Sequence, residues 1–451
     1  MRAKMAKSSL RLVLFASLLV FLNGCWWASL LTGQKTFKLS PDLGTPHTPF
    51  YQQGDWIIAR ASLHNHTNIS DGVYTPEDLI TLAKREGIAI LAITDHREGA
   101  IKLSGGIKIP VNGIEKIGYD EYFKRLTPLK QETEAGNKMI ILLGAEVNPF
   151  LYNIGKFPYA VIMEQNSHFV VYRVSNPDVF TKMPAWREVS IKPVTKVPGQ
   201  KFVQDWVDYI SQNSGLVFVA HPASEMSTWV LTIHFYSEPP YKNVRLKNIT
   251  GFSSLPESFV PEVAGAGGVW DSVLAEYLDG MREKPVWADA DCDFHGNFKD
   301  DLTTYCGTTM FYLKEFTEKD IYSAMQQGRM VALEGEAFQN SYVAEFSVSD
   351  KGTPEDAVML GREIKISAPP VVRFRLDHEV PGVKTSLIRN GKVIKEVEGT
   401  SLEYKDQEMF DKKMPAYYRI EVAGPITNIV NPMDPYPKNN ILFTNPVFVR
   451  F

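Results

Sequence analysis

Histidines and carboxylates recur at short spacings along the chain. His64 and His66 are separated by one residue, Asp71 follows them, and Asp95 directly precedes His96. Further along stand Glu146, His221, Asp293 and His295. Neutral imidazole nitrogen and carboxylate oxygen together suit zinc, manganese or iron. We therefore predict a site for divalent metal ions.

The distribution of the histidines along the chain is stronger evidence for a metal site than the spacing of any one pair. The chain has nine histidines, and a chance His-x-His pair is expected about 0.2 times in such a chain, so this pair alone is weak. Five of the nine lie at the carboxyl ends of segments that are typical of strands, each beside or near a carboxylate. The alternative, a set of ordinary core or surface histidines, is less consistent with that placement.

Helix and strand signals alternate from Trp56 onward and would position these side chains. Thr75 and Pro76 suit an N-cap and a first helical position, the helix runs to residue 86, and residues 88–93 follow as an apolar strand. The same order recurs at 119–135 and 138–143, at 202–212 and 216–220, and at 270–283 and 285–288. Strands that are apolar throughout indicate a parallel sheet covered by helices, and the repeats favour a barrel over an open sheet. Such folds place their chemistry at the carboxyl ends of the strands.

Alternation along an extended strand predicts which side chains share a face. His64 and His66 should point to one side, within reach of a single ion. Asp293 and His295 should share a face in the same way, with Cys292 on the other one. The two residues of each pair are therefore expected to face the same side of their strand.

In their order along the chain, these motifs resemble those of the PHP (polymerase and histidinol phosphatase) family of metal-dependent phosphoesterases. The matching motifs are His64-x-His66, Ser70-Asp71-Gly72, Thr94-Asp95-His96, Glu146, Ala220-His221-Pro222 and Asp293-x-His295. The resemblance covers about residues 56–335. It implies a distorted seven-stranded (β/α) barrel that holds two or three divalent ions, with zinc, manganese or iron as the candidates.

The resemblance also implies a further histidine ligand between the glutamate and the His-Pro motif. His168 is the candidate for that position. By analogy, one ion is held by His64, His66, Glu146 and Asp293, a second by Glu146, His168 and His221, and a third by Asp71, His96 and His295.

The ligand set implies hydrolysis by a metal-activated water, whose pKa falls toward about 7 on a metal ion. We expect a metal-dependent hydrolase of phosphoesters. One alternative is a carboxylic or carbamic ester hydrolase on the same ions. Another is a non-catalytic envelope lipoprotein that binds glycans and whose metal ions are structural, without the open coordination position that catalytic ions keep.

Three further side chains near the ligands have candidate roles. Asp95 is a candidate hydrogen-bond acceptor behind the ligands or a proton acceptor, the alternative being an ordinary polar loop residue. Arg97 is a candidate clamp for a phosphate or carboxylate, the alternative being a solvated arginine. Cys292 is expected to be a structural thiol or a disulfide with Cys306, rather than a ligand.

Two features depart from the family pattern. Phe294 stands where the family usually has a small residue, and the segment between His221 and Trp270, rich in proline, glycine and serine, suggests an enlarged loop. We expect both to reshape the mouth of the pocket. The choice of substrate is therefore not carried over from the family.

Residues 1–24 are typical of a signal peptide. Four basic residues accompany an apolar run of 11 residues at 12–22, which is too short to span a bilayer comfortably. The run ends at Leu22-Asn23-Gly24-Cys25, which resembles a bacterial lipobox and implies lipidation of Cys25, the alternative being a plain signal peptide. Residues 25–54 have the composition of a linker. We expect a lipid-anchored protein of the bacterial cell envelope that faces the periplasm or the exterior.

Residues 55–338 form the expected barrel, and residues 339–451 an expected smaller, all-β second domain. Its short alternating segments, with the two-residue turn Asn390-Gly391 between two of them, predict a β-sandwich. A barrel followed by such a sandwich resembles a secreted branch of the PHP family. Glycan binding and simple bracing of the barrel both remain open as roles for the sandwich.

The composition excludes some classes of protein. With 451 residues, 44% of them hydrophobic and 22% charged, the chain is expected to be globular rather than disordered. The formal net charge is -4, or -8 after loss of the four basic residues of 1–24, which argues against a nucleic-acid partner. We expect a small-molecule or envelope ester as substrate and a membrane contact through the lipid anchor.

Overall fold

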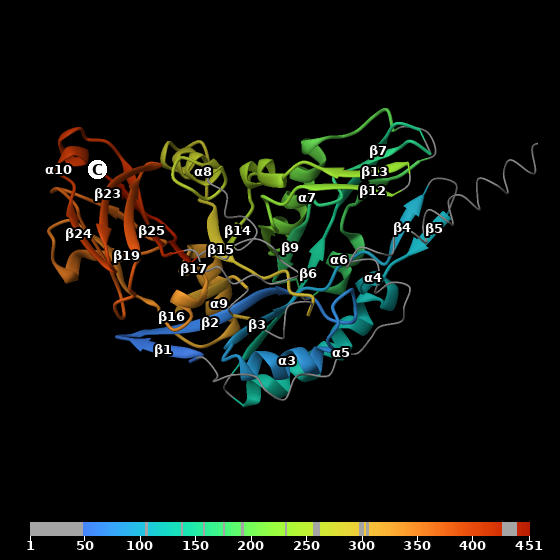
Figure 1. Ribbon diagram of the computed structural model, residues 1–451, viewed down its shortest axis with the longest axis horizontal. Coiled ribbons are helices and arrows are strands. Elements are labelled where there is room, and N and C mark those ends of the chain that lie inside the picture. Colours follow the sequence, from blue (N-terminus) through green and yellow to red (C-terminus); the bar gives the residue numbers. More distant parts are fainter. Residues whose placement is uncertain are drawn as a thin grey trace, which may run out of the picture.

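The computed structural model describes residues 48–103, 107–136, 139–156, 158–174, 176–190, 194–230, 232–255, 262–296, 302–303, 306–425 and 440–451. The predicted signal peptide, Cys25 and most of the predicted linker lie outside these residues. The chain is a mixed α/β protein (Figure 1). Within the described ranges, no helix combines the length and the apolar character that a membrane crossing requires.

One long mixed sheet runs through the molecule (Figure 1). In spatial order its first nine strands are β15 (Trp287–Ala290), β14 (Gly251–Leu255), β11 (Leu216–Val219), β9 (Phe169–Tyr172), β6 (Ile140–Val147), β3 (Ile90–Ile93), β2 (Trp56–Asn65), β16 (Thr308–Leu313) and β17 (Met330–Glu334). β2, β3 and β6 are parallel, as are β11, β14 and β15, whereas β9 runs antiparallel to both of its neighbours. Most side chains of these strands are buried, as expected of a sheet covered on both faces.

The sheet curls back on itself without becoming the closed barrel that the sequence predicts. Among the described residues, no strand ladder joins β15 to β16 or β17. Side chains bridge the gap instead. Thr309 Oγ1 accepts from the backbone N of Ala290 at 2.9 Å and donates to its carbonyl oxygen at 2.7 Å. Asn445 Nδ2 donates to the carbonyl oxygens of Ala288 at 2.8 Å and Met330 at 3.0 Å, so it links β15 to β17.

Helices pack against the strands of this sheet. They are α3 (Pro76–Arg85), α5 (Tyr119–Ala135), α7 (Gln200–Gln212), α8 (Val269–Leu278) and α9 (Glu318–Gln327). The short helices α4 (Ile114–Ile117) and α6 (Pro177–Lys182) contact α5. The predicted start of α3 is confirmed, because Thr75 Oγ1 accepts from Asp78 N at 3.1 Å and Pro76 is the first helical residue. The predicted bounds of α5 are also confirmed, whereas α8 ends at Leu278 rather than at residue 283.

The segment between His221 and Trp270 is not the enlarged loop that its composition predicts. It contains β12 (Met226–Val230), β13 (Ile233–Ser237), the 3-10 helix η2 (Pro240–Arg245) and the central strand β14. β14 was missed because its sequence, GFSSL, has little apolar character. Its serines are nevertheless paired inside the protein: Ser253 Oγ donates to Asp291 Oδ1 at 2.8 Å and Ser254 Oγ to the carbonyl oxygen of Asp289 at 2.7 Å.

Insertions between the central strands form two smaller sheets. One has the order β10 (Trp186–Glu188), β7 (Phe150–Ile154), β8 (Val161–Met163), β13 and β12. The other is the hairpin of β4 (Ala100–Leu103) and β5 (Ile107–Pro110). In Figure 1 both lie on the side of the molecule opposite the C-terminal strands.

The C-terminal strands extend the long sheet. Beyond β17 it continues through β26 (Ile441–Thr444), β25 (Ala416–Ala423), β22 (Lys384–Arg389) and β23 (Lys392–Glu398), with β27 (Val447–Arg450) and β20 (Glu363–Lys365) attached. A four-stranded sheet contains β19 (Ala357–Met359), β18 (Val343–Ser349), β21 (Val371–Leu376) and β24 (Ser401–Lys405). The shorter elements are β1 (Phe50–Gln53), η3 (Glu336–Phe338), η4 (Pro354–Asp356) and α10 (Gln407–Asp411).

These C-terminal strands share a second hydrophobic core, to which β18, β21, β22 and β25 contribute. The predicted hairpin turn is confirmed: Asn390 and Gly391 join β22 to β23 with φ angles of 49° and 77°. That residues 339–451 form a separate sandwich domain stays a prediction, because β26 pairs directly with β17 of the preceding region. The last residues of the expected linker are also structured, since β1 pairs with β2.

Candidate metal centre

All nine side chains that the sequence singled out as ligands gather at one end of the central strands. Within the described residues, three groups have candidate ligand atoms within 4.8 Å of one another. The groups are His66, Asp71, His96 and His295; His64, His66, Glu146 and Asp293; and His96, Glu146 and His168. The ninth side chain, His221, joins the third group because its Nε2 lies 3.2 Å from Glu146 Oε1.

Glu146, at the end of β6, stands at the centre of the cluster. Its Oε2 lies 3.3 Å from His64 Nε2, 3.2 Å from His66 Nε2 and 3.0 Å from His96 Nδ1. Its Oε1 lies 2.7 Å from His168 Nδ1 and 3.2 Å from His221 Nε2. The two oxygens therefore face two different sets of histidines, as a carboxylate that bridges two cations would.

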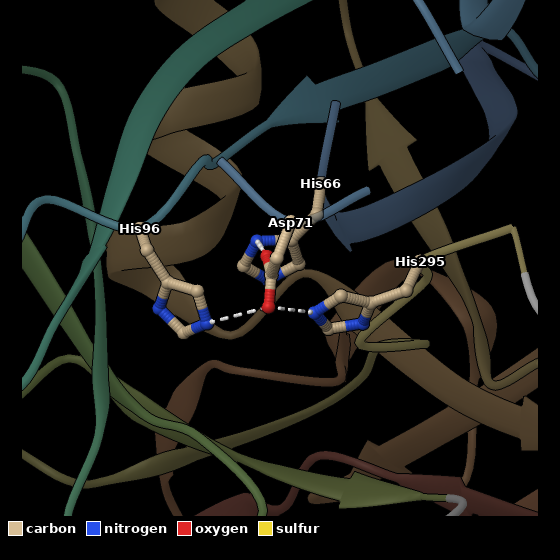
Figure 2. Close-up of side chains that lie close together, drawn as sticks. All are labelled: His66, Asp71, His96 and His295. Carbon is tan, nitrogen blue, oxygen red and sulfur yellow. Dashed lines mark ion pairs between the residues drawn. The ribbon is translucent and has the colours of Figure 1, made fainter. Parts of the chain in front are cut away.

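Asp71 is the second point of convergence, on the opposite side of His66. Figure 2 shows the side chains of His66, His96 and His295 around it. Asp71 Oδ2 lies 3.2 Å from His295 Nε2 and 3.6 Å from His96 Nε2. The rings of His66 and His295 stack with centroids 4.2 Å apart. His66 and His96 thus lie between Asp71 and Glu146 and contact both carboxylates.

The convergence does not come from regular strand alternation. His64, His221 and Asp293 have φ angles of 60°, 28° and 47°, in the left-handed region that costs a non-glycine residue about 1–3 kcal/mol. The ladder between β2 and β3 also shifts register next to His64. The prediction that these side chains share a space is confirmed, but its reason is wrong, because irregular backbone turns them inward.

The free ends of these side chains fit a cation. Seven buried atoms in the cluster have no hydrogen-bond partner: Nε2 of His64, His66 and His295, both carboxylate oxygens of Asp71, Oε2 of Glu146 and Oδ1 of Asp293. Several of these atoms face one another at 3.1–3.3 Å. Ligand atoms about 2.1 Å from one ion lie about 3.0–3.4 Å apart in octahedral or tetrahedral geometry. The cluster therefore has the atoms and the spacing of a metal centre.

The other ring nitrogen of His64 has a partner that the sequence analysis missed. His64 Nδ1 lies 3.1 Å from Asp291 Oδ2, and Asp291 Oδ1 accepts from Ser253 at 2.8 Å. A carboxylate on Nδ1 fixes the ring and directs Nε2 toward the cluster, which is the common arrangement behind a ligating histidine. The available signal was the position of Asp291 two residues before Asp293.

Asp95 supports the loop that carries two candidate ligands. Its carboxylate accepts from the backbone N and Oγ1 of Thr67 and from the backbone N and Oγ of Ser70, at 2.7–3.2 Å. Ser70 Oγ also lies 3.3 Å from His66 Nδ1. Asp95 therefore acts on His66 through Ser70, and its role as a proton acceptor stays a prediction.

Arg97 and Phe294 are placed differently from the sequence-based expectation. Arg97 is buried, not solvated: Nε donates to Tyr119 Oη at 2.8 Å, and Nη2 donates to the carbonyl oxygens of Phe180 and Met183 at 3.4 and 3.3 Å. These bonds connect it to α5 and α6, and its contact with substrate stays a prediction. Phe294 is fully buried and stacks on Tyr74, so it does not line the pocket mouth as expected.

Cys292 and Cys306 form a disulfide. Of the two expectations for Cys292, the disulfide is therefore the one that the structure shows. Cys292 stands between Asp291 and Asp293, so this bond lies directly beside the cluster.

The electrostatics of the cluster match a cation site. Burial alone would raise the pKa of Glu146, but His168, His96 and His64 hold it well below its usual range. Burial opposes ionisation of Asp71 too, and His295 and His96 lower its pKa. Burial alone would lower the pKa of His96 and His295, but nearby carboxylates raise these values to about 9 and about 10. The carboxylates are thus ionised and available to a cation.

One side of the cluster is open. The side chains of His64, His66 and Glu146 are inaccessible, whereas Asp293 is 22% exposed and His295 is 12% exposed. His96 and His168 are 11% and 10% exposed, so solvent reaches the centre past these two rings as well as past Asp293 and His295.

Part of the chain that carries this cluster is similar to known proteins. Residues 62–281 match the family model described as PHP domain. A 5'-3' exoribonuclease of Haemophilus influenzae is 30% identical over 98 residues, which cover 18% of this chain and 36% of that protein. The chain thus spans about a third of the length of this curated relative.

Two solved structures align with this chain at low TM-scores. A two-domain protein from Bacteroides vulgatus, described as containing a predicted PHP-like metal-dependent phosphoesterase, is 12% identical with a TM-score of 0.41, over 88% of this chain and 99% of that one. A lesion-specific endonuclease from Pyrococcus furiosus is 11% identical with a TM-score of 0.28, over 60% of this chain and 56% of that one. The match to the PHP domain model ends at residue 281, and the cluster extends beyond it to Asp293 and His295.

Proposed function

We propose that this protein is a metal-dependent hydrolase of phosphoesters. The observation that carries the proposal is the set of seven buried ligand atoms without hydrogen-bond partners, which face a common space. Zinc, manganese and iron are the ions that six imidazoles and three carboxylates suit. When bound, such ions lower the pKa of a coordinated water and withdraw charge from the oxygens of an ester.

The charge of the cluster favours an anionic substrate. Its three carboxylates, Asp71, Glu146 and Asp293, contribute -3, and neutral histidines contribute nothing. Two divalent ions would leave a net charge of +1, and three would leave +3. A phosphoester is attracted to such a centre, whereas an uncharged carboxylic ester is not. This balance supports phosphoesters over the alternative substrates on the same site.

The protein residues around the centre orient the ligands. Asp291 holds the His64 ring through Nδ1, and Ser70 holds the His66 ring, itself fixed by Asp95. His295 Nδ1 lies 2.7 Å from the carbonyl oxygen of Asp293, which leaves its Nε2 to face Asp71. Ligands fixed in this way need little rearrangement when an ion binds, which is how a supporting shell raises metal affinity.

The direct test measures metal content and hydrolysis of the full-length protein. Elemental analysis would be combined with chromogenic phosphomonoester, phosphodiester and carboxylic ester substrates. We expect two or three bound ions and turnover of a phosphoester. We expect Glu146→Gln to lose bound metal and activity together, because both oxygens of Glu146 face ligand histidines.

Glu121→Gln is the matched control, since Glu121 is an exposed carboxylate on α5. It should retain both the metal and the activity. A metal-loaded protein that is inert toward all three substrates, or a Glu146→Gln variant as active as its parent, would contradict the proposal.

We also propose that the protein is an envelope lipoprotein anchored through Cys25. The support is the lipobox-like sequence Leu22-Asn23-Gly24-Cys25 and the Cys292–Cys306 disulfide, a bond that persists in oxidising compartments. Membrane fractionation of the parent and of Cys25→Ser tests this. Release of the variant from the membrane is expected, and unchanged fractionation would contradict the anchor.

A further inference from the structure

The disulfide lies where it can act on the metal centre. It joins Cys292, which directly precedes Asp293, to Cys306, 14 residues later in the chain. The bond therefore closes a loop whose first residues include Asp293 and His295. Both are candidate ligands, and each belongs to a different group of the cluster.

The far end of the disulfide is anchored to the strand that carries the other ligands. Cys306 lies two residues before β16, and β16 pairs with β2, the strand that contains His64. The backbone N of Gly307 donates to the carbonyl oxygen of Asp291 at 3.1 Å. The disulfide thus ties the loop of Asp293 to the same framework that positions His64.

The backbone next to the bond needs such a restraint. Asp293 and His64 both have left-handed φ angles, which non-glycine residues rarely adopt without a surrounding constraint. Three backbone hydrogen bonds, Cys292 N to Leu63 O, Phe294 N to His64 O and His66 N to Phe294 O, run alongside them at 2.9–3.2 Å. The disulfide adds a covalent link at the start of this irregular segment.

We propose that the Cys292–Cys306 disulfide positions Asp293 and His295 for metal binding, so that the oxidation state of this pair and the occupancy of the metal centre are coupled. The inference rests on the proposed metal centre. The coupling is selective, because none of the described residues of the disulfide-closed loop belongs to the position formed by Glu146, His168 and His221. Loss of the disulfide should therefore lower metal affinity at the positions that use Asp293 or His295. It should leave the affinity of the position formed by Glu146, His168 and His221 unchanged.

The coupling works in both directions. Reduction by dithiothreitol breaks the S–S bond, and the reagent supplies two electrons and two protons, giving two cysteine thiols and the cyclic disulfide of dithiothreitol. Suppose that the disulfide raises the association constant of the metal by some factor. Bound metal must then raise the equilibrium constant for forming the disulfide by the same factor, because thermodynamic linkage is reciprocal.

The test compares the full-length protein with the double variant Cys292→Ala/Cys306→Ala in titrations with Mn²⁺, followed by the electron paramagnetic resonance signal of the free ion. We expect the variant to bind Mn²⁺ about 10–100-fold more weakly at the positions that use Asp293 or His295. One position should keep its affinity. Val372→Ala, in the second core away from the cluster, controls for general loss of stability and should bind Mn²⁺ like the parent.

A second measurement checks the reciprocal effect. The fraction of Cys292 and Cys306 in the disulfide, measured by alkylation and peptide mass spectrometry in dithiothreitol buffers, should rise when Mn²⁺ is present. Equal Mn²⁺ affinities in the parent and the double variant would overturn the inference, as would equal losses in the double variant and Val372→Ala. Absence of Mn²⁺ and Zn²⁺ binding to the oxidised parent would instead overturn the metal centre, and this inference with it.

Discussion

Glu146 is the residue on which the metal centre depends most, because its two oxygens face five histidines from four separate segments. The remaining residues of the site are of two kinds: candidate metal ligands, and residues that hold those ligands by hydrogen bonds. Six of the ligand candidates, His64, His66, Asp71, Glu146, Asp293 and His295, direct atoms without hydrogen-bond partners into the cluster. Asp95 and Asp291 instead use their oxygens to hold the ligands in place. This division makes different predictions for the two kinds of residue.

The support of His64 by Asp291 can be tested with a matched pair of substitutions. Asp291→Asn removes the charge behind His64 Nδ1, so we expect metal affinity about 10–100-fold lower. Asp289→Asn should bind metal like the parent, because burial and the neighbouring Asp291 raise the pKa of Asp289 well above its usual range and favour its neutral form. Both affinities can be read by calorimetry. Equal affinities in the two variants would argue against the positioning role.

Metal binding should release protons. The carboxylates raise the pKa of His96 to about 9 and that of His295 to about 10, so at pH 7.5 both rings are protonated in the metal-free protein. A ligating histidine is neutral, and the ion must therefore displace these protons. We expect metal affinity to rise between pH 6 and 9. The binding enthalpy should also change with the ionisation enthalpy of the buffer, and identical heats in all buffers would contradict this.

The candidate site was largely predictable from the sequence, and the fine geometry was not. The motifs from His64 to His295 placed eight of the nine ligand candidates at strand ends or in the loops after them, which meet at one edge of such a sheet, and the resemblance to the PHP family added His168. The left-handed residues His64 and Asp293 and the partner Asp291 were not foreseen. Those features depend on contacts between segments far apart in the chain.

Among the elements, helices were predicted better than strand pairings. The bounds of α5 follow from local signals, namely periodicity and the glycine stop at residue 136. β14 was missed, and so was the five-stranded sheet that begins with β10, because their pairing is long-range and their composition resembles a loop. These segments form strands because of tertiary contacts and not because of their local sequence preference.

The contact between α8 and β25 depends on a buried ion pair. Arg419 Nη2 lies 2.7 Å from Asp271 Oδ2, and its Nε donates to Asp271 Oδ1 at 2.8 Å. Asp271→Asn would leave the guanidinium buried without its counter-charge, so we expect a loss of about 3–5 kcal/mol in the free energy of unfolding. Urea titration measures it.

The double variant Asp271→Leu/Arg419→Met provides the comparison. It removes both charges, so it should lose less stability than Asp271→Asn alone. A double variant that loses as much stability as Asp271→Asn would contradict the unpaired buried charge as the cause of the loss.

At the scale of the whole molecule, the sheet is continuous from β15 to β23, and the second core contains residues from both sides of the predicted boundary at 338/339. Ile58, Met310 and Leu333 come from β2, β16 and β17 and are at most 1% exposed. The sequence suggested two domains because helix signals fade after residue 339. That change in pattern carries no information about the pairing of β17 with β26.

Truncation after residue 338 should therefore give a protein that does not fold stably. It would expose Ile58, Met310 and Leu333, each worth about 1.5–3 kcal/mol of burial, and remove the partner of β17. We expect aggregation or an unfolded circular dichroism spectrum. A soluble fragment with a cooperative thermal transition would support the independent domains that the sequence suggested.

The most direct test of the account is anomalous X-ray diffraction from crystals of the full-length protein grown with Mn²⁺. We predict one peak among His64, His66, Glu146 and Asp293 and another beside Asp71 and His295. The account would be contradicted if the Mn²⁺ peaks lay elsewhere while these side chains kept the arrangement described above.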